Sequence, residues 1–380
     1  MMRKHASPAR SFRVGILGAG FISDLHIAAL KTLPFVEVCA VCDQASGKAA
    51  LTGERWNIPQ VYSSLGEMLE KSSLDVIHIL LPPDRHFEAA LACLEAGVDV
   101  FLEKPLATSS EECEALLRTS SRSGQRAGVN HNARYHPALE RLKTAIRAWR
   151  LGRVQHVAAT INLPLRQLSQ GQHDHWMFRD PGNIVLEQAP HPLSQIQLLV
   201  GNVESVSALA SGRRLLNTGQ PFYDTWQISM VCERGSAQCS LSFGGGFPVS
   251  TLQVIGEDAA AFVDLRTNRV QISEQTRFLE PVDHLLDGVR NGLGAMRQSA
   301  GNFVDYGLSF LKLKAPNDPF FAGIRGSVQA FYEALQEGSA LPVDLEQASA
   351  VITTCEQIVR SAGGEQLNHT DVSKEIAHAG

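Results

Sequence analysis

The stretch Val14–Ser23, VGILGAGFIS, decides the fold of this chain. An apolar run that ends at Leu17 is typical of a buried strand, and the residues from Phe21 onward have the spacing of a helix. Between the two, Gly18 permits a tight turn, and Gly20 lets the backbone approach a ligand at the start of the helix. A strand, a glycine-rich turn and a helix in this order indicate a site for the pyrophosphate of a dinucleotide.

An acid at the end of the next predicted strand supports this interpretation. Asp43 follows the apolar run 35–41, where a carboxylate accepts hydrogen bonds from both hydroxyls of a ribose. The same charge repels a 2′-phosphate, so we expect NAD rather than NADP. A plain glycine turn with a helix cap has the same local sequence, but the flanking elements and the acid favour the dinucleotide. The expected cofactor-binding residues here are Gly18, Gly20, Phe21, Ile22 and Asp43.

Apolar runs continue to alternate with helical segments up to about residue 130. This alternation predicts βαβ units, and therefore an α/β domain with a doubly wound parallel sheet. After residue 130, several segments alternate apolar and polar residues with a period of two. They predict an α+β domain with an open, mostly antiparallel sheet.

These patterns divide the chain into four parts. We expect an NAD-binding domain at 13–130 and a substrate and oligomerisation domain at 131–362, whose last helix can pack back on the first domain. Residues 1–12 and 363–380 are expected to be a disordered lead-in and a tail. Residues 282–313 are amphipathic but rich in glycine, which predicts interrupted helices that serve in subunit contact or as a pocket lid.

Composition excludes several classes of protein. The net charge of -5 argues against nucleic-acid binding, which needs a basic patch. No apolar stretch approaches the roughly 18 residues of a membrane helix. The 7 cysteines are scattered and odd in number, which predicts a reducing, cytoplasmic environment. Cys39 and Cys42 lie three apart within a predicted strand, which favours core packing over a redox pair.

Glu103-Lys104-Pro105 closes another predicted strand, 98–102. Ligands of open α/β sheets bind beyond the carboxyl ends of the strands, so Lys104 lies where chemistry is expected. A lysine beside a nicotinamide can hydrogen-bond a substrate hydroxyl and favour its alkoxide. A surface salt bridge followed by a turn explains the local sequence equally well.

Glu187 and His191 form a second candidate pair. Residues four apart share a helix face, but Pro190 makes an unbroken helix improbable, so we predict a loop with His191 at a helix start. Histidine can carry a proton near neutral pH. A capping carboxylate and a packed histidine are the alternative for an isolated pair.

Together these motifs resemble the Gfo/Idh/MocA oxidoreductases over nearly the whole chain. The resemblance includes the glycine turn with Asp43, Pro82-Pro83 with His86, Glu103-Lys104-Pro105, and the segment 129–137, VNHNARYHP. It implies a Rossmann domain followed by an open-sheet domain, with Lys104 and His191 flanking the nicotinamide. Further expected cofactor contacts are Pro82, His86, Glu103, Lys104 and Asn132.

The resemblance also implies a substrate site, and here the chain departs from the family. Many members carry an acid at two positions where this chain has Glu187 and Ser194, which argues against a myo-inositol-like substrate. The segment around His173-Asp174-His175 is polar and aromatic; with no third ligand placed by spacing, we expect no metal there. The expected substrate-binding residues are Lys104, Arg134, Tyr135, Arg166, His173, His175, Trp176, Gln188 and His191, and the catalytic ones are Lys104, His191 and Glu187.

The resemblance to enzymes of surface-polysaccharide synthesis implies NAD-dependent oxidation of a ring hydroxyl, as in UDP-N-acetylglucosamine 3-dehydrogenase. A redox-neutral glycosidase or epimerase that retains NAD, a dehydrogenase of a free sugar or inositol, and a regulatory protein that only binds the cofactor remain as alternatives. The residues do not decide whether Lys104 or His191 takes the proton. A homodimer or homotetramer, and an aminotransferase acting on the product, are the expected partners.

Overall fold

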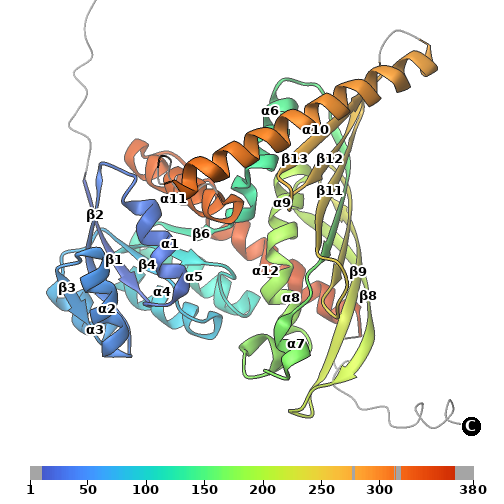
Figure 1. Cartoon of the computed structure of the whole chain (residues 1–380). Coiled ribbons are helices and arrows are strands. Elements are labelled where there is room, and N and C mark those ends of the chain that lie inside the picture. Colours follow the sequence, from blue (N-terminus) through green and yellow to red (C-terminus); the bar gives the residue numbers. More distant parts are fainter. Residues whose placement is uncertain (1–10, 276–278, 312, 314–317, 364–380) are drawn as a thin grey trace, which may run out of the picture. The chain divides into compact units, whose positions relative to one another are not determined.

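The structure is a computed structural model that describes residues 11–275, 279–311, 313 and 318–363 (Figure 1). The expected lead-in and tail therefore lie almost entirely outside the described residues. The chain divides into two compact units, each described by itself. The first comprises the described residues up to His136 together with Leu308–Ile352, and the second comprises Pro137–Gly307 and the described residues from Thr353.

A parallel sheet of 6 strands forms the first unit, in the order β3-β2-β1-β4-β5-β6. This is the order of a doubly wound dinucleotide-binding sheet, so the predicted fold of this unit is confirmed. The strands are β1 (Phe12–Leu17), β2 (Val36–Cys42), β3 (Gln60–Tyr62), β4 (Val76–Ile79), β5 (Asp99–Glu103) and β6 (Ala127–Asn130). The sequence does not reveal β3, because three residues are too few to show a period.

Helices follow the strands of the first unit. Right-handed crossovers on either side of the β1–β4 pair place them on opposite faces of the sheet. They are α1 (Phe21–Leu30), α2 (Ser46–Trp56), α3 (Leu65–Lys71), η1 (Pro83–Arg85), α4 (His86–Glu95), α5 (Ser110–Ser123) and η2 (Asn132–Tyr135).

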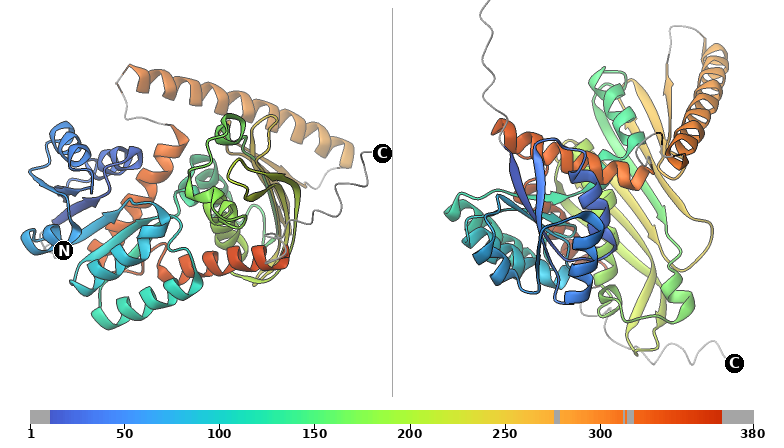
Figure 2. Two further views of the ribbon diagram at one scale, coloured as in Figure 1. Left: turned by 90° about the horizontal axis from the view of Figure 1, so that it is seen from below. Right: turned by 60° about the vertical axis from the view of Figure 1, so that its left-hand side comes forward.

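The helix α11 (Pro319–Glu337) belongs to the first unit although it comes late in the chain. It contacts α1 (Figure 2), and Ile324, Val328 and Tyr332 share the buried core with strand β1. Gly128 of β6 makes this packing possible, because a Cβ there would lie 2.6 Å from the ring of Phe331. The first half of α12 (Leu345–Ser361) is also part of this unit.

The second unit contains a sheet of 7 strands in the order β13-β12-β11-β7-β10-β9-β8. Only β7 and β10 pair in parallel among these described strands, so the predicted mostly antiparallel sheet is confirmed. The strands are β7 (Val154–Asn162), β8 (Val203–Leu215), β9 (Pro221–Cys232), β10 (Gly235–Ser242), β11 (Val249–Gly256), β12 (Ala259–Asp264) and β13 (Arg269–Glu274).

Helices of the second unit pack against this sheet. The helix α9 (Pro190–Val200) packs on β7 and β10, where alternate strand residues are buried. The other helices are α6 (Pro137–Arg147), α7 (Arg166–Gln170), η3 (Trp176–Phe178), α8 (Asn183–Gln188) and α10 (Glu280–Phe310). Within the part of the chain that the structure describes, no helix has the length and apolar character needed to span a membrane.

The prediction of interrupted helices at residues 282–313 is wrong. One continuous helix, α10, runs over 31 residues from Glu280 to Phe310. Its glycines cost roughly 1 kcal/mol each, but contacts to strand β13 hold the helix in place. A local propensity argument misses these contacts because they come from another part of the unit.

Candidate active site

The candidate cofactor site lies at the carboxyl edge of the six-stranded sheet. Gly18 follows β1, Asp43 follows β2, Pro82 lies three residues after β4, and Glu103 ends β5. Because the strands are parallel, their carboxyl ends meet at one edge, next to the β1–β4 reversal of strand order. The fold thus brings Gly18, Asp43, Pro82 and Glu103, four of the residues that the sequence predicted for NAD, to one edge of the sheet.

Gly18 occupies a position that only glycine tolerates. Its φ is +101°, and a Cβ there would lie 2.5 Å from the carbonyl oxygen of Leu80. Its own N–H donates to the carbonyl of Cys42 at 2.8 Å, which ties the turn to the end of β2. The close approach of two backbone segments fixes the turn where the first helix begins.

Gly20 differs from Gly18 in leaving open space. It is the N-cap of α1 with φ -89°, and no side chain among the described residues caps the helix. A Cβ at Gly20 would meet no described atom within 4 Å. An open helix start whose N–H groups lack a side-chain partner fits an anionic pyrophosphate.

Asp43 holds the glycine turn, in addition to the ribose contact predicted for it. One carboxylate oxygen accepts from the N–H of Ala19 and the other from the N–H of Ala45, both at 2.8 Å. A carboxylate has about four acceptor positions, so it can still receive ribose hydroxyls. The sequence suggested only the ribose contact. The observed bonds add a structural role for this acid.

Glu103 lies in a buried hydrogen-bond network that sequence analysis missed. Its Oε1 lies 2.9 Å from Nε2 of His26 and accepts from the side-chain amide of Asn130 at 2.6 Å. His26 Nδ1 lies 2.9 Å from Nδ1 of His78, and His78 Nε2 lies 3.0 Å from the hydroxyl of Tyr332. The network therefore runs from the core helix α11 to the residue before Lys104.

The geometry restricts where the protons of this network lie. If the Tyr332 hydroxyl donates to His78, then His78 donates to His26 and His26 donates to Glu103. If the proton between the two rings belongs to His26 instead, His78 donates to Tyr332, and His26 donates to Glu103 only when both of its ring nitrogens carry a proton. With a neutral His26, the first arrangement alone directs an N–H of His26 at the carboxylate.

Glu103 stays ionised despite its burial. Burial alone would raise its pKa, but the hydrogen bond and charge of His26, the amide of Asn130 and the charge of Lys104 lower the pKa to about 2. The backbone N–H of Lys104 also lies 3.2 Å from Oε2 of this carboxylate. A fixed negative charge thus adjoins the candidate catalytic lysine at the end of β5.

These shifts predict that stability falls in acid. Burial lowers the pKa of His78 and His86 below that of an exposed histidine. Below about pH 6.5 these two histidines bind a proton in the unfolded chain but not in the folded chain. We therefore expect the free energy of unfolding to fall by up to about 1.4 kcal/mol per pH unit for each histidine. The stabilisation from Glu103 is present above about pH 4.5 and is lost as pH falls toward its folded value.

Urea unfolding at pH 8, 7, 6 and 5 measures this effect. We expect the urea midpoint to be constant above pH 6.5 and to decline below it. In the His78→Gln variant, the midpoint should decline less steeply. A midpoint that stays constant from pH 8 to pH 5 would contradict the assignment.

Both ring nitrogens of His86 face backbone carbonyl oxygens of the protein. Its Nδ1 lies 2.7 Å from the carbonyl oxygen of Pro105 and its Nε2 lies 2.8 Å from that of Leu81. The buried ring thus connects the loop after β4, which contains Pro82, with the loop after β5, which contains Lys104. Any influence of His86 on NAD binding acts through the position of these loops.

The residues predicted from the segment 129–137 lie under α11. Asn132 is buried, and a Cβ on Gly323 of α11 would lie 2.7 Å from its carbonyl oxygen. Arg134 donates to the side-chain oxygen of Gln347 at 2.7 Å and to the carbonyl of Pro342, and burial lowers its pKa. Tyr135 packs beside Gly326. These contacts fix the C-terminal part of the first unit.

The remaining predicted residues lie in the second unit. The prediction of a loop at 187–190 is wrong, because Glu187 and Gln188 are the last two residues of α8. The prediction that His191 lies at a helix start agrees with the structure, where it is the second residue of α9. Pro190 begins α9, where its missing N–H costs nothing. The indole N–H of buried Trp176 donates to Glu187 at 2.8 Å, so these two residues are brought together.

The other expected substrate residues lie on short elements nearby in the chain. Arg166 begins α7 and is exposed, His173 bonds to the side chain of Asn217, and His175 precedes η3. Across the described residues, with gaps at 276–278, 312 and 314–317, no three metal-ligating side chains lie together. All seven cysteines lie within the described residues, and they are buried and outside any disulfide, including Cys39 and Cys42 in the core strand β2.

Comparison with protein families decides the class of the protein. A profile described as an oxidoreductase family with an NAD-binding Rossmann fold matches residues 12–131, and the Gfo/Idh/MocA C-terminal domain matches residues 139–262. The chain belongs to the Gfo/Idh/MocA oxidoreductase family. It is therefore an oxidoreductase with an NAD-binding domain, and the glycine turn fits that cofactor.

Its relatives differ in what they act on. A 4-carboxy-2-hydroxymuconate-6-semialdehyde dehydrogenase from Sphingobium is 23% identical over 292 residues, covering 75% of this chain and 90% of its own. The WlbA dehydrogenase from Bordetella pertussis, solved with NADH and UDP-GlcNAcA, has a TM-score of 0.72 at 22% identity, covering 93% of this chain and 96% of its own. Levoglucosan dehydrogenase, solved with NADH and levoglucosan, has a TM-score of 0.76 at 18% identity, covering 94% of this chain and 98% of its own. The two structural likenesses confirm the fold.

Proposed function

We propose that this Gfo/Idh/MocA oxidoreductase uses NAD to oxidise a secondary ring hydroxyl of a sugar, with a UDP-sugar such as UDP-N-acetylglucosamine, oxidised at C3, as the leading substrate. The observation that carries the reaction type is Lys104, which follows β5 at the same sheet edge as the glycine turn. The polar and aromatic residues of the second unit, including Arg166, His173 and Trp176, support a sugar ligand. The fold shared with WlbA adds support for a nucleotide sugar.

Each proposed residue has a distinct task. NAD, when bound, accepts the hydride from the carbon that carries the hydroxyl. Lys104 binds that hydroxyl and favours loss of its proton, while ionised Glu103 helps to hold the lysine backbone in place. His191, at the start of α9, is the second candidate for proton transfer. Glu187 is proposed to support His191, and its carboxylate is itself held by Trp176.

A substrate panel tests this proposal. The enzyme is incubated with NAD and UDP-N-acetylglucosamine, its C6 uronic acid UDP-GlcNAcA, UDP-glucose, free N-acetylglucosamine, levoglucosan and myo-inositol, and nicotinamide reduction is followed by absorbance. We expect NAD to be reduced in the presence of UDP-sugars. Addition of an aminotransferase and an amino donor then traps the ketone product as an amino sugar.

The other outcomes separate the alternatives. Reduction of NAD with levoglucosan or inositol, but with none of the UDP-sugars, would contradict the nucleotide-sugar assignment. The proposed reaction type would still hold in that case. Conversion of a sugar with no net NADH would indicate the redox-neutral cycle. Binding of NAD without conversion of any sugar would contradict the enzymatic proposal and favour a regulatory role.

A further inference from the structure

The long helix α10 is attached to the second unit by its polar face. Its neighbour β13 is the edge strand of the seven-stranded sheet. The side-chain amide of Gln298 accepts from the N–H of Val270 at 2.9 Å and donates to its carbonyl at 2.8 Å. Gln298 thus satisfies both backbone groups that an edge strand leaves open at this residue.

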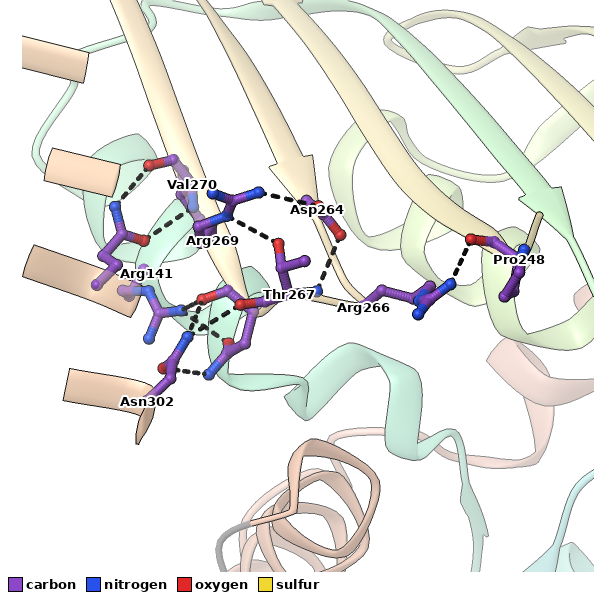
Figure 3. A network of polar contacts seen from close by, with 10 residues as sticks. Arg141, Pro248, Asp264, Arg266, Thr267, Arg269, Val270 and Asn302 are labelled. Carbon is purple, nitrogen blue, oxygen red and sulfur yellow. Dashed lines mark hydrogen bonds and ion pairs between the residues drawn. The ribbon is translucent and has the colours of Figure 1, made fainter. Parts of the chain in front are cut away.

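A second carboxamide repeats this arrangement one turn later. Asn302 donates to the carbonyl oxygens of Thr267 at 2.9 Å and Asn268 at 3.1 Å, and accepts from the side chain of Asn268 at 3.0 Å (Figure 3). Asn291, seven residues before Gln298, lies 3.4 Å from the hydroxyl of Ser273. These three residues lie on one side of the helix, and that side is occupied by the sheet.

The opposite side of α10 is apolar and exposed. At about 100° per residue, the apolar residues Val282, Leu285, Val289, Leu293, Met296 and Phe303 lie roughly 120–180° away from the mean direction of the three carboxamides. None of residues 280–310, all of which the structure describes, is buried. A surface helix normally turns its apolar stripe toward the core, so this orientation is inverted. The exposed fractions are 66% for Leu285, 51% for Val289, 60% for Leu293, 64% for Met296 and 76% for Phe303.

The spacing of this apolar stripe indicates a helical partner. Val282, Val289, Met296, Phe303 and Phe310 follow one another at intervals of seven. The position three residues after each of the first four contains Leu285, Gly292, Ser299 and Tyr306. Apolar residues at intervals of seven, with small residues at two of the four positions that lie three residues later, fit the seam between two closely packed helices.

A lipid surface fits the helix less well. Interfacial membrane helices carry many lysines and arginines on their polar face. The residues of α10 include the acids Glu280, Asp283, Asp287 and Asp305 against only Arg290 and Arg297. This excess of negative charge disfavours an anionic membrane. A second copy of the same chain supplies a helix with the same repeat, and the four acids lie within about 80° of the carboxamides, away from the apolar stripe through which the two helices would meet.

We propose that α10 pairs with α10 of a second copy in antiparallel orientation, centred at Gly294. In that register Met296 lies opposite Gly292 of the partner subunit, and Val289 lies opposite Ser299 of the partner subunit. At these two positions a large side chain meets a small one, as close helix packing requires, and Leu285 lies opposite Phe303 of the partner subunit. A parallel pair instead places Gly292 against its own copy and Phe303 against its own copy, which leaves one gap and one clash.

Molar mass in solution tests the interface. We expect Val289→Glu/Phe303→Glu to halve the mass measured by light scattering, with unchanged circular dichroism. Leu51→Glu replaces an equally exposed leucine of α2, 62% exposed, and should leave the mass unchanged. A monomeric wild type, or a double variant that keeps the wild-type mass, would overturn the proposal.

Engineered cysteines test the orientation. Leu285→Cys together with Phe303→Cys should form an intermolecular disulfide, while the seven native cysteines are buried and do not interfere. Phe303→Cys alone should not, because antiparallel pairing separates its two copies by about 27 Å at 1.5 Å per residue. Cross-linking of Phe303→Cys alone would overturn the antiparallel register. Flotation of the wild type, but not of Val289→Glu/Phe303→Glu, with phosphatidylcholine–phosphatidylglycerol vesicles would assign the face to lipid instead.

Discussion

Lys104→Ala should abolish turnover while NAD still binds. The side chain is proposed to contact the reacting hydroxyl, and removal of a group that assists proton transfer lowers kcat by roughly 10²–10⁴-fold. The glycine turn, Asp43 and the open start of α1 lie on other strands and keep their own contacts. We therefore expect the Kd for NAD to change by less than about threefold, which corresponds to under about 1 kcal/mol.

Stopped-flow reduction of NAD and calorimetric titration of NAD separate these two effects. Lys48→Ala is the matched control, since it removes an exposed lysine of α2 and should leave both measurements unchanged. A Lys104→Ala enzyme with wild-type kcat would show that the lysine is only a surface residue after a turn.

Gly18→Ala and Gly20→Ala should differ in their effect on folding stability, although both should weaken NAD binding. A Cβ at Gly18 meets the carbonyl of Leu80 at 2.5 Å on a backbone of positive φ, so the turn must distort. We expect a loss of at least about 1–3 kcal/mol of folding stability, together with weak NAD binding. At Gly20 the Cβ enters open space at an ordinary φ of -89°, so stability should stay within about 0.5 kcal/mol of the wild type.

NAD affinity distinguishes the second glycine from an ordinary helix cap. The added methyl group of Gly20→Ala points into the space proposed for the pyrophosphate, so we expect the Kd for NAD to rise by at least about tenfold, or about 1.4 kcal/mol. Chemical unfolding and NAD titration of both variants provide the comparison. Unchanged NAD affinity in a stable Gly20→Ala variant would place the cofactor elsewhere.

The predictable part of this molecule depends on short-range signals. Gly18, Gly20 and Asp43 are recognisable because a strand, a turn and a helix follow one another within one stretch of sequence. The parallel order of the strands then follows from their alternation with helices. Residues such as His86 are identified by the motif, but the motif does not reveal that both ring nitrogens face backbone carbonyls.

The unpredictable part depends on contacts between distant residues. His26 and Glu103 are 77 residues apart, and His78 and Tyr332 are 254 apart, so no local pattern connects them. A histidine within a predicted helix was the only signal for His26, and it has many structural explanations. The continuity of α10 was missed for the same reason, because Gln298 and Asn302 find their partners on β13.

Transfer of isotope tests the central claim most directly. The sugar that is turned over, with UDP-N-acetylglucosamine first, is prepared with deuterium on the ring carbon to be oxidised and mixed with the enzyme and NAD for a single turnover. Mass spectrometry of the quenched nicotinamide should show NADH heavier by about 1 Da in the wild type and no such product in Lys104→Ala, since hydride transfer moves that one atom. Oxidised sugar accompanied by unlabelled NADH, or sugar conversion with the label always left on the sugar and never found on the nicotinamide, would contradict NAD-dependent oxidation at this carbon.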